Sequence, residues 1–193
     1  KVAMESGMPF GGDSAITVTG DTELRIRIPD WVDEGDAIIK VGGRTAAYDL
    51  EKGYAVLAVK DGDKVEVSFP MEPRRIYNDE QVTFTEGMVA LGYGPLVYCF
   101  ESTDNLAIPG FGTGEFCMGV APDAKLTTQF EADLLGGVIT ISAEAHYYDF
   151  NGKLQTASAK AIPFYARMNR GVSPSYVFVG EEPRAADSQP KSW

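Results

Sequence analysis

A polar and aromatic cluster near the end of the chain is the first candidate for chemistry. The stretch "AIPFYARMNRG", residues 161–171, sets two arginines and an asparagine beside two aromatic residues. It could line a substrate site, or it could be a strand with a polar end. Period-two alternation puts Ile162, Phe164 and Ala166 on one face and Tyr165 and Arg167 on the other. Pro163 predicts an edge strand or a strand start, with residues 167–170 at the rim of the sheet.

The single histidine is the second candidate. A Ser/His/Asp arrangement would have to be built around His146, in "AEAHYYDF". The chain has no strand–turn–helix serine motif to supply the nucleophile. His146 falls on a predicted hairpin arm, where a solvent-facing or hydrogen-bonded side chain is the simpler interpretation.

Exposed aromatic side chains could bind sugars by stacking on their apolar faces. Trp31 follows a proline and an aspartate at the end of a predicted strand. Tyr147 and Tyr148 occupy adjacent strand positions, so they point to opposite faces and we expect one of them to be exposed. Packing in the core or at a sheet edge is the alternative for each ring.

The composition excludes several classes of function. The chain has 193 residues, 28 acidic against 17 basic, and a net charge of -11. This charge argues against a nucleic-acid binder, which needs basic patches, and against anchoring to an anionic membrane. No run approaches the roughly 20 apolar residues of a membrane helix. The chain begins at Lys1 without a signal segment, and we interpret it as an internal or processed piece. A secreted, a periplasmic and a cytoplasmic location all remain open for it.

Short alternating runs separated by turn residues predict an all-β chain. "ELRIRIPDW", "KVEVSFP" and "GVITISA" each alternate apolar with polar residues. Gly42-Gly43, Asp61-Gly62-Asp63 and Asn151-Gly152 mark hairpins, and Asn151-Gly152 suits a type I′ turn, in which both residues have positive φ. "DAKLTTQFEADLL" fits a helix or a strand, and we favour the strand.

The pattern predicts two antiparallel β-sandwich domains, of jelly-roll or immunoglobulin-like type, in tandem. Pro70 and Pro73 in "FPMEPRR" interrupt strand pairing. We therefore expect a first sandwich over residues 1–72 and a second over residues 73–182. Residues 183–193 form a polar, flexible tail.

Three motifs in order, "LRIRIPDW", "MVALGYGPLVYC" and "AIPFYARMNRG", resemble the carboxyl-terminal region of glycoside hydrolase family 127, the β-L-arabinofuranosidase-like enzymes. The resemblance spans about residues 1–180. Two positions depart from it: Tyr93 stands where the family has an arginine before Gly-Pro, and the usual tryptophan near Arg167 is missing.

The resemblance implies that the catalytic site lies elsewhere. In that family an (α/α)6 barrel precedes the sandwiches, with a cysteine nucleophile on zinc, held by a Glu-x-Cys motif and a later Cys-Cys pair. This chain has no run of long helices for such a barrel. Glu115-Phe116-Cys117 matches Glu-x-Cys, but we interpret it as a chance match, because Cys99 is the only other cysteine. The two cysteines could form one disulfide or remain free.

We therefore expect a non-catalytic accessory region that holds no cofactor itself, although the parent enzyme could use zinc. Its expected partner is the barrel of the same parent chain, contacted through Arg167, Asn169 and Arg170, and it could add a homodimer contact. The first alternative is a carbohydrate-binding module for plant-type glycans that uses Trp31, Tyr147 and Tyr148. The second alternative is a surface-interaction or adhesin sandwich.

Overall fold

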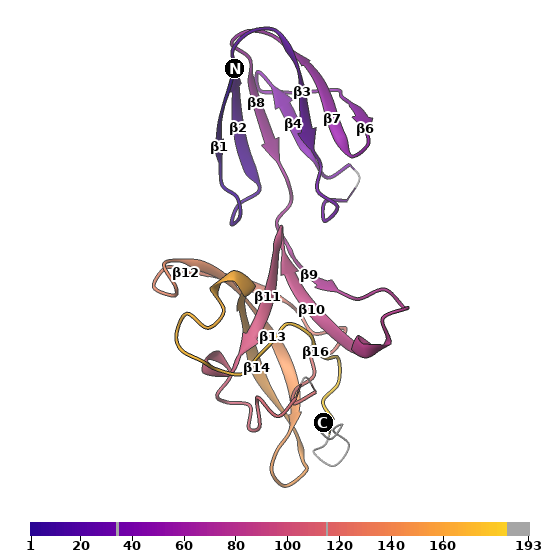
Figure 1. Ribbon diagram of the computed structural model, residues 1–193, viewed down its shortest axis with the longest axis vertical. Coiled ribbons are helices and arrows are strands. Elements are labelled where there is room, and N and C mark those ends of the chain that lie inside the picture. The colour runs from indigo at the N-terminus through magenta and orange to yellow at the C-terminus, as the bar shows by residue number, and fades with distance from the viewer. Residues whose placement is uncertain (34, 115, 185–193) are drawn as a thin grey trace. The chain divides into compact units, whose positions relative to one another are not determined.

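The computed structural model describes residues 1–33, 35–114 and 116–184. Its regular structure is β-strand apart from short 3-10 turns, and its sheets are antiparallel. The predicted all-β class is thus confirmed (Figure 1). The chain divides into two compact units, the first ending at Glu72 and the second beginning at Pro73. Of the predicted flexible tail, residues 185–193 lie outside the described part. No helix in the described part is long and apolar enough to cross a membrane.

The described residues of the first unit, 1–33 and 35–72, form two sheets. The larger has five strands in the order β1-β2-β8-β4-β5, and the smaller has three in the order β3-β7-β6. The strands are β1 (Val2–Ser6), β2 (Asp13–Val18), β3 (Thr22–Arg27), β4 (Ile38–Val41), β5 (Arg44–Thr45), β6 (Asp49–Glu51), β7 (Tyr54–Val59) and β8 (Lys64–Ser68).

Alternation along these strands builds the core of the first unit. In β8, Val65 and Val67 are buried while Glu66 between them is exposed. Because successive side chains point to opposite faces of a sheet, each such strand gives one face to the core. The buried members of the core are Ile16, Val18, Val32, Ala37, Ile39, Ala55, Leu57, Val59, Val65, Val67 and Phe69.

Three positions of the first unit require glycine, for two different reasons. Gly42 and Gly43 join β4 to β5 with φ of 58° and 78°, as the predicted turn requires. Gly12 is required for space instead, because a Cβ there would lie 1.8 Å from the carbonyl oxygen of Phe69.

Across residues 73–114 and 116–184, the second unit is one connected sheet of eight strands. Its main path runs β12-β13-β14-β11-β10-β16, with β9 added to β10 and β15 added to β11. The strands are β9 (Pro73–Ile76), β10 (Met88–Tyr93), β11 (Leu96–Glu101), β12 (Thr127–Glu131), β13 (Val138–Tyr148), β14 (Leu154–Pro163), β15 (Ser175–Tyr176) and β16 (Val179–Gly180). The favoured strand in "DAKLTTQFEADLL" is present as β12.

The strands β10 and β11 change partners along their length. β10 pairs with β16 at Met88 and Val89, and with β11 at Gly92 and Tyr93. Farther along, β11 pairs with β14 from Tyr98 onward. These changes join all the strands of the second unit into one network instead of two separate sheets.

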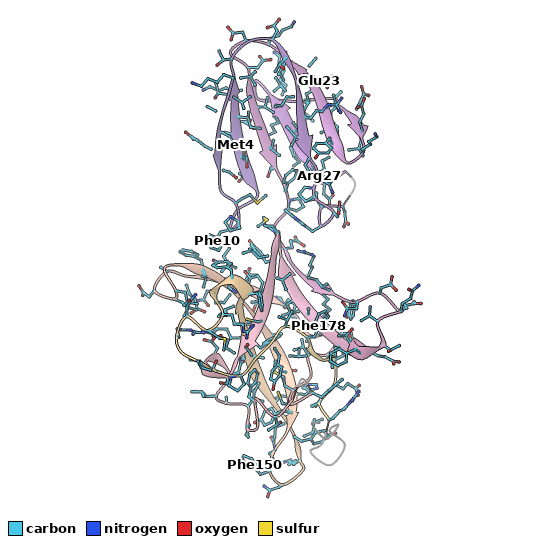
Figure 2. All side chains as sticks on the ribbon, in the orientation of Figure 1. Met4, Phe10, Glu23, Arg27, Phe150 and Phe178 are labelled. Carbon is cyan, nitrogen blue, oxygen red and sulfur yellow. The ribbon has the colours of Figure 1, made fainter. Side chains whose placement is uncertain are left out.

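The β13–β14 hairpin is the longest feature of the second unit, and Phe150 marks its tip (Figure 2). The predicted type I′ turn is wrong in detail. Gly152 has φ of 73°, but Asn151 is not among the positive-φ residues. The amide of Gly152 donates to the carbonyl oxygen of Asp149. The amide of Asp149 donates to the carbonyl oxygen of Lys153. This is a type I turn closed by a left-handed glycine, the usual form of a three-residue hairpin loop.

Candidate functional site

The segment after β14 leaves the sheet earlier than its alternation predicts. Pro163 is the last residue of β14, opposite Tyr98 of β11, and is not a strand start. Residues 164–166 then form a 3-10 turn, η3 (Phe164–Ala166). The prediction of a strand through residue 167 was wrong: Ala166 is buried while Phe164 is exposed, so the two do not share a face.

A buried ion pair fixes the end of this segment. The Arg170 guanidinium donates from Nη1 to Asp104 Oδ1 at 2.7 Å, from Nη2 to Glu101 Oε2 at 2.9 Å, and also contacts Asp104 Oδ2. The side chains of Glu101 and Asp104 are 1% and 7% exposed. Their hydrogen bonds and charges raise the pKa of Arg170, which therefore stays protonated.

Glu101 also holds the backbone of the same segment. Its Oε1 accepts a 2.6 Å hydrogen bond from the amide of Met168, a residue with φ of 63°. A non-glycine residue in this left-handed region needs support from its surroundings. The carboxylate of Glu101 thus binds the segment at two points, the Met168 amide and the Arg170 guanidinium.

The remaining side chains of this segment face solvent. Phe164, Tyr165 and Met168 are 43%, 57% and 37% exposed. Arg167 lies over the Phe164 ring, with its Cζ 5.5 Å from the ring centroid, and Asn169 is exposed. We call Phe164, Tyr165, Arg167, Met168 and Asn169 the loop surface. It is an apolar and cationic surface held by a buried anchor.

The predicted contact residues therefore divide into two kinds. Arg167 and Asn169 are available on the loop surface. Arg170 is committed to Glu101 and Asp104 and acts as an anchor, which the prediction of a barrel contact missed. The only sequence signal for this anchor is the pair of carboxylates in "CFESTD", one at the end of a strongly apolar strand and one just after it.

The predicted sugar-binding aromatics are divided between the two units. Trp31 belongs to the first unit, where it packs against the core and meets Phe69 edge-on at 6.1 Å between ring centroids. Tyr147 and Tyr148 belong to the second unit and lie on opposite faces of β13, with Tyr148 36% exposed. No two of these rings lie on one face of the same sheet, so each could stack on a sugar only as a single ring.

His146 lies on β13 as predicted, with its Nε2 3.6 Å from Glu144 Oε1 on the same strand. Its backbone pairs with Gly119 through two hydrogen bonds of 2.8 Å. No serine or aspartate contact to the imidazole is found within the described part of the chain. This arrangement fits a histidine on a sheet surface.

The described residues do not fit a zinc site. Cys99 and Cys117 are both buried, and Cys99 is a free thiol. Burial raises the pKa of the Cys99 thiol to about 12, whereas zinc binds the thiolate. Within residues 1–33, 35–114 and 116–184, no group of three or more His, Cys, Asp or Glu side chains is placed to hold a metal. Glu115 of the Glu-x-Cys match lies outside the described residues.

Comparison with known proteins identifies both units. Residues 1–71 match the family model of the β-L-arabinofuranosidase GH127 middle domain, and residues 73–180 match the glycoside hydrolase family 127 carboxyl-terminal domain. A non-reducing end β-L-arabinofuranosidase of Bifidobacterium longum subsp. longum is 30% identical. The match covers 92% of this chain and 30% of that protein.

Solved structures agree. A GH127 β-L-arabinofuranosidase from Geobacillus stearothermophilus T6 superposes with a TM-score of 0.83 at 32% identity, covering 93% of this chain and 30% of the other. A second GH127 β-arabinofuranosidase gives a TM-score of 0.78 at 30% identity, covering 93% and 31%. The chain thus spans less than a third of the length of these relatives, and it belongs to glycoside hydrolase family 127, of which it carries the middle and carboxyl-terminal domains.

Proposed function

We propose that this chain is the non-catalytic accessory region of a longer β-L-arabinofuranosidase-like enzyme, which packs on its catalytic barrel and stabilises it. One observation carries the proposal: almost the whole chain aligns with two non-barrel domains of relatives that are about three times as long. A region of this kind acts by burying surface against the rest of its enzyme.

The loop surface supports a specific contact. A soluble chain gains nothing by itself from holding Phe164, Tyr165 and Met168 in water, because exposed apolar area is unfavourable. Glu101 holds the backbone that carries these side chains, through the Met168 amide and the Arg170 guanidinium, which lowers the entropy lost on docking. In this proposal Arg167 and Asn169 touch the barrel, and Arg170 positions them.

A chimera tests this contact. In the Bifidobacterium longum relative, this chain replaces the matching region, and activity on a β-L-arabinofuranoside and the unfolding temperature are measured. We expect an active chimera, and Phe164→Ser with Met168→Ser should lower its unfolding temperature and activity. Phe150→Ser is the matched control, because Phe150 is 89% exposed at a hairpin tip outside the loop surface. Equal effects of the loop and control variants would overturn the contact.

The catalytic chemistry is assigned to the barrel, together with the zinc that the resemblance implies. Metal analysis and an arabinofuranosidase assay on this purified chain alone check the assignment. Stoichiometric zinc bound by the chain, or turnover without a barrel, would disprove it. Ultracentrifugation of the same sample tests the proposed homodimer contact.

Glycan binding is the second candidate, and its support is limited to the half-exposed ring of Tyr148. Calorimetry with arabinan and arabinoxylan oligomers tests it, with Tyr148→Ala as the variant. Binding heat that disappears in the variant would favour a carbohydrate-binding module. A chain that binds neither sugar nor barrel would point instead to a surface-interaction or adhesin role.

A further inference from the structure

The inward face of β1 is uncovered in the first unit. Val2 and Met4 stand opposite Val18 and Ile16 in the β1–β2 register, so all four side chains lie on the same side of the sheet. Val18 and Ile16 are 1% and 9% exposed in the core. Val2 and Met4 remain 53% and 62% exposed, although they point the same way.

The smaller sheet is too narrow to cover β1. It has three strands, whereas the larger sheet has five. Its edge strand β3 lies on the flank of β1 and β2, because only residues 19–21 join β2 to β3. The inward residues of β3, Leu24 and Ile26, are only partly buried. Their neighbours on β7, Leu57 and Ala55, are 4% and 0% exposed. Burial therefore declines toward β3 in one sheet and toward β1 in the other.

The opposite flank of the same unit is partly closed by the chain itself. There the chain crosses from β5 to β6 through residues 46–48, and Ala46 and Tyr48 pack against the core. Leu50 of β6 is 52% exposed at that flank, so it resembles Met4 in exposure and direction. Among the described residues, no such crossing joins β1 to β3.

Two strand edges border the uncovered face, and they define what can cover it. Within the described part, β3 pairs only with β7, and β1 pairs only with β2. A free strand edge presents unpaired N–H and C=O groups that another extended segment satisfies by strand addition. A helix or an irregular loop would leave these groups unpaired.

We propose that an extended segment from the part of the longer enzyme outside this chain adds to the free edge of β3 as a fourth strand and covers Val2 and Met4. The matching segment has about the six residues of β3 and alternates apolar with polar side chains. The inference rests on the proposed function, because that function supplies the longer chain, which is about three times the length of the matched region.

Hydrogen exchange measured by mass spectrometry tests the added strand. The rates of peptides spanning β3 are compared between this chain alone and the longer enzyme that contains it. We expect exchange in β3 to be at least about tenfold slower in the longer enzyme, because its edge amides become paired. Equal rates in both would overturn the inference. Slow exchange in the chain alone, accompanied by a dimer, would assign the edge to a second copy and would also overturn it.

A pair of variants makes the test specific. Met4→Asp should restore fast exchange to β3 in the longer enzyme, because it puts a charge under the added strand, and should leave β3 unchanged in this chain alone. Leu50→Asp is the matched control and should change β3 in neither. If the loop surface, residues 164–169, gains protection in the longer enzyme while β3 does not, the accessory function stands and the added strand is rejected.

Discussion

The Nη2 of Arg170 lies 2.9 Å from Oε2 of Glu101, a carboxylate that is 1% exposed and almost seventy positions away in the chain. Asp104 completes the ion-pair cluster. Two buried carboxylates thus share one guanidinium at the base of the loop surface. Removing one member of such a cluster leaves an uncompensated buried charge.

Arg170→Ala should destabilise the second unit by about 3 kcal/mol, because Glu101 and Asp104 would be left as buried carboxylates without their cation. Hydrogen exchange of β11 and β14 peptides at increasing urea concentrations measures the change unit by unit. Arg167→Ala is the matched control and should fall within about 0.5 kcal/mol of wild type, since Arg167 is exposed. Equal losses in the two variants would mean that the ion pairs do not stabilise the unit.

Gly12→Ala should destabilise the first unit by about 2 kcal/mol, because the new methyl group would overlap the carbonyl of Phe69 and force two backbone segments apart. Fluorescence of Trp31, which packs on Phe69, reports unfolding of this unit when Trp193 is replaced by Phe in every protein compared. Gly11→Ala is the neighbouring control: its nearest contact would be 3.7 Å away, so stability should be unchanged or slightly higher. A Gly12→Ala protein as stable as wild type would rule out the close approach.

The strand pattern could be predicted because each strand carries its own alternation, and the β8 residues Val65 and Val67 are buried as that alternation requires. The loop surface could not be predicted in the same way. Alternation continues in the letters past Pro163, but the chain turns out of the sheet there and is held by Glu101, which lies far away in sequence. Local periodicity contains no information about such a distant ion pair.

The hairpin turn shows the same limit on a smaller scale. Asn151-Gly152 marks the position of the turn, but a two-residue type I′ loop and a three-residue loop can both use this glycine. The carboxylate of Asp149, which accepts hydrogen bonds from the amides of Asn151 and Lys153, favours the longer loop. That preference depends on a side-chain contact and not on the two turn residues.

Gly152→Ala should therefore cost about 1 kcal/mol, because alanine is strained at a φ of 73°. Asn151→Ala should be close to neutral, since Asn151 has no positive φ in this turn. Urea unfolding followed by exchange of β13 and β14 peptides compares the two. A large loss for Asn151→Ala would indicate that both residues adopt positive φ, as in a type I′ turn.

The buried thiol of Cys99 should make stability fall in alkaline solution. Its pKa is raised from 9.0 to about 12, first by burial and then by the charge of Glu101. Above pH 9 the unfolded chain releases this proton while the folded chain keeps it, so the stabilisation is complete below pH 9 and is lost as the pH rises toward 12. The free energy of unfolding should drop by about 1 kcal/mol between pH 9 and pH 10 from this group.

Cys99→Ala should remove that part of the slope while the rest, from groups such as Tyr98, remains. Urea unfolding of both proteins at several pH values measures the slopes, and equal slopes would show that the thiol does not remain protonated in the folded chain.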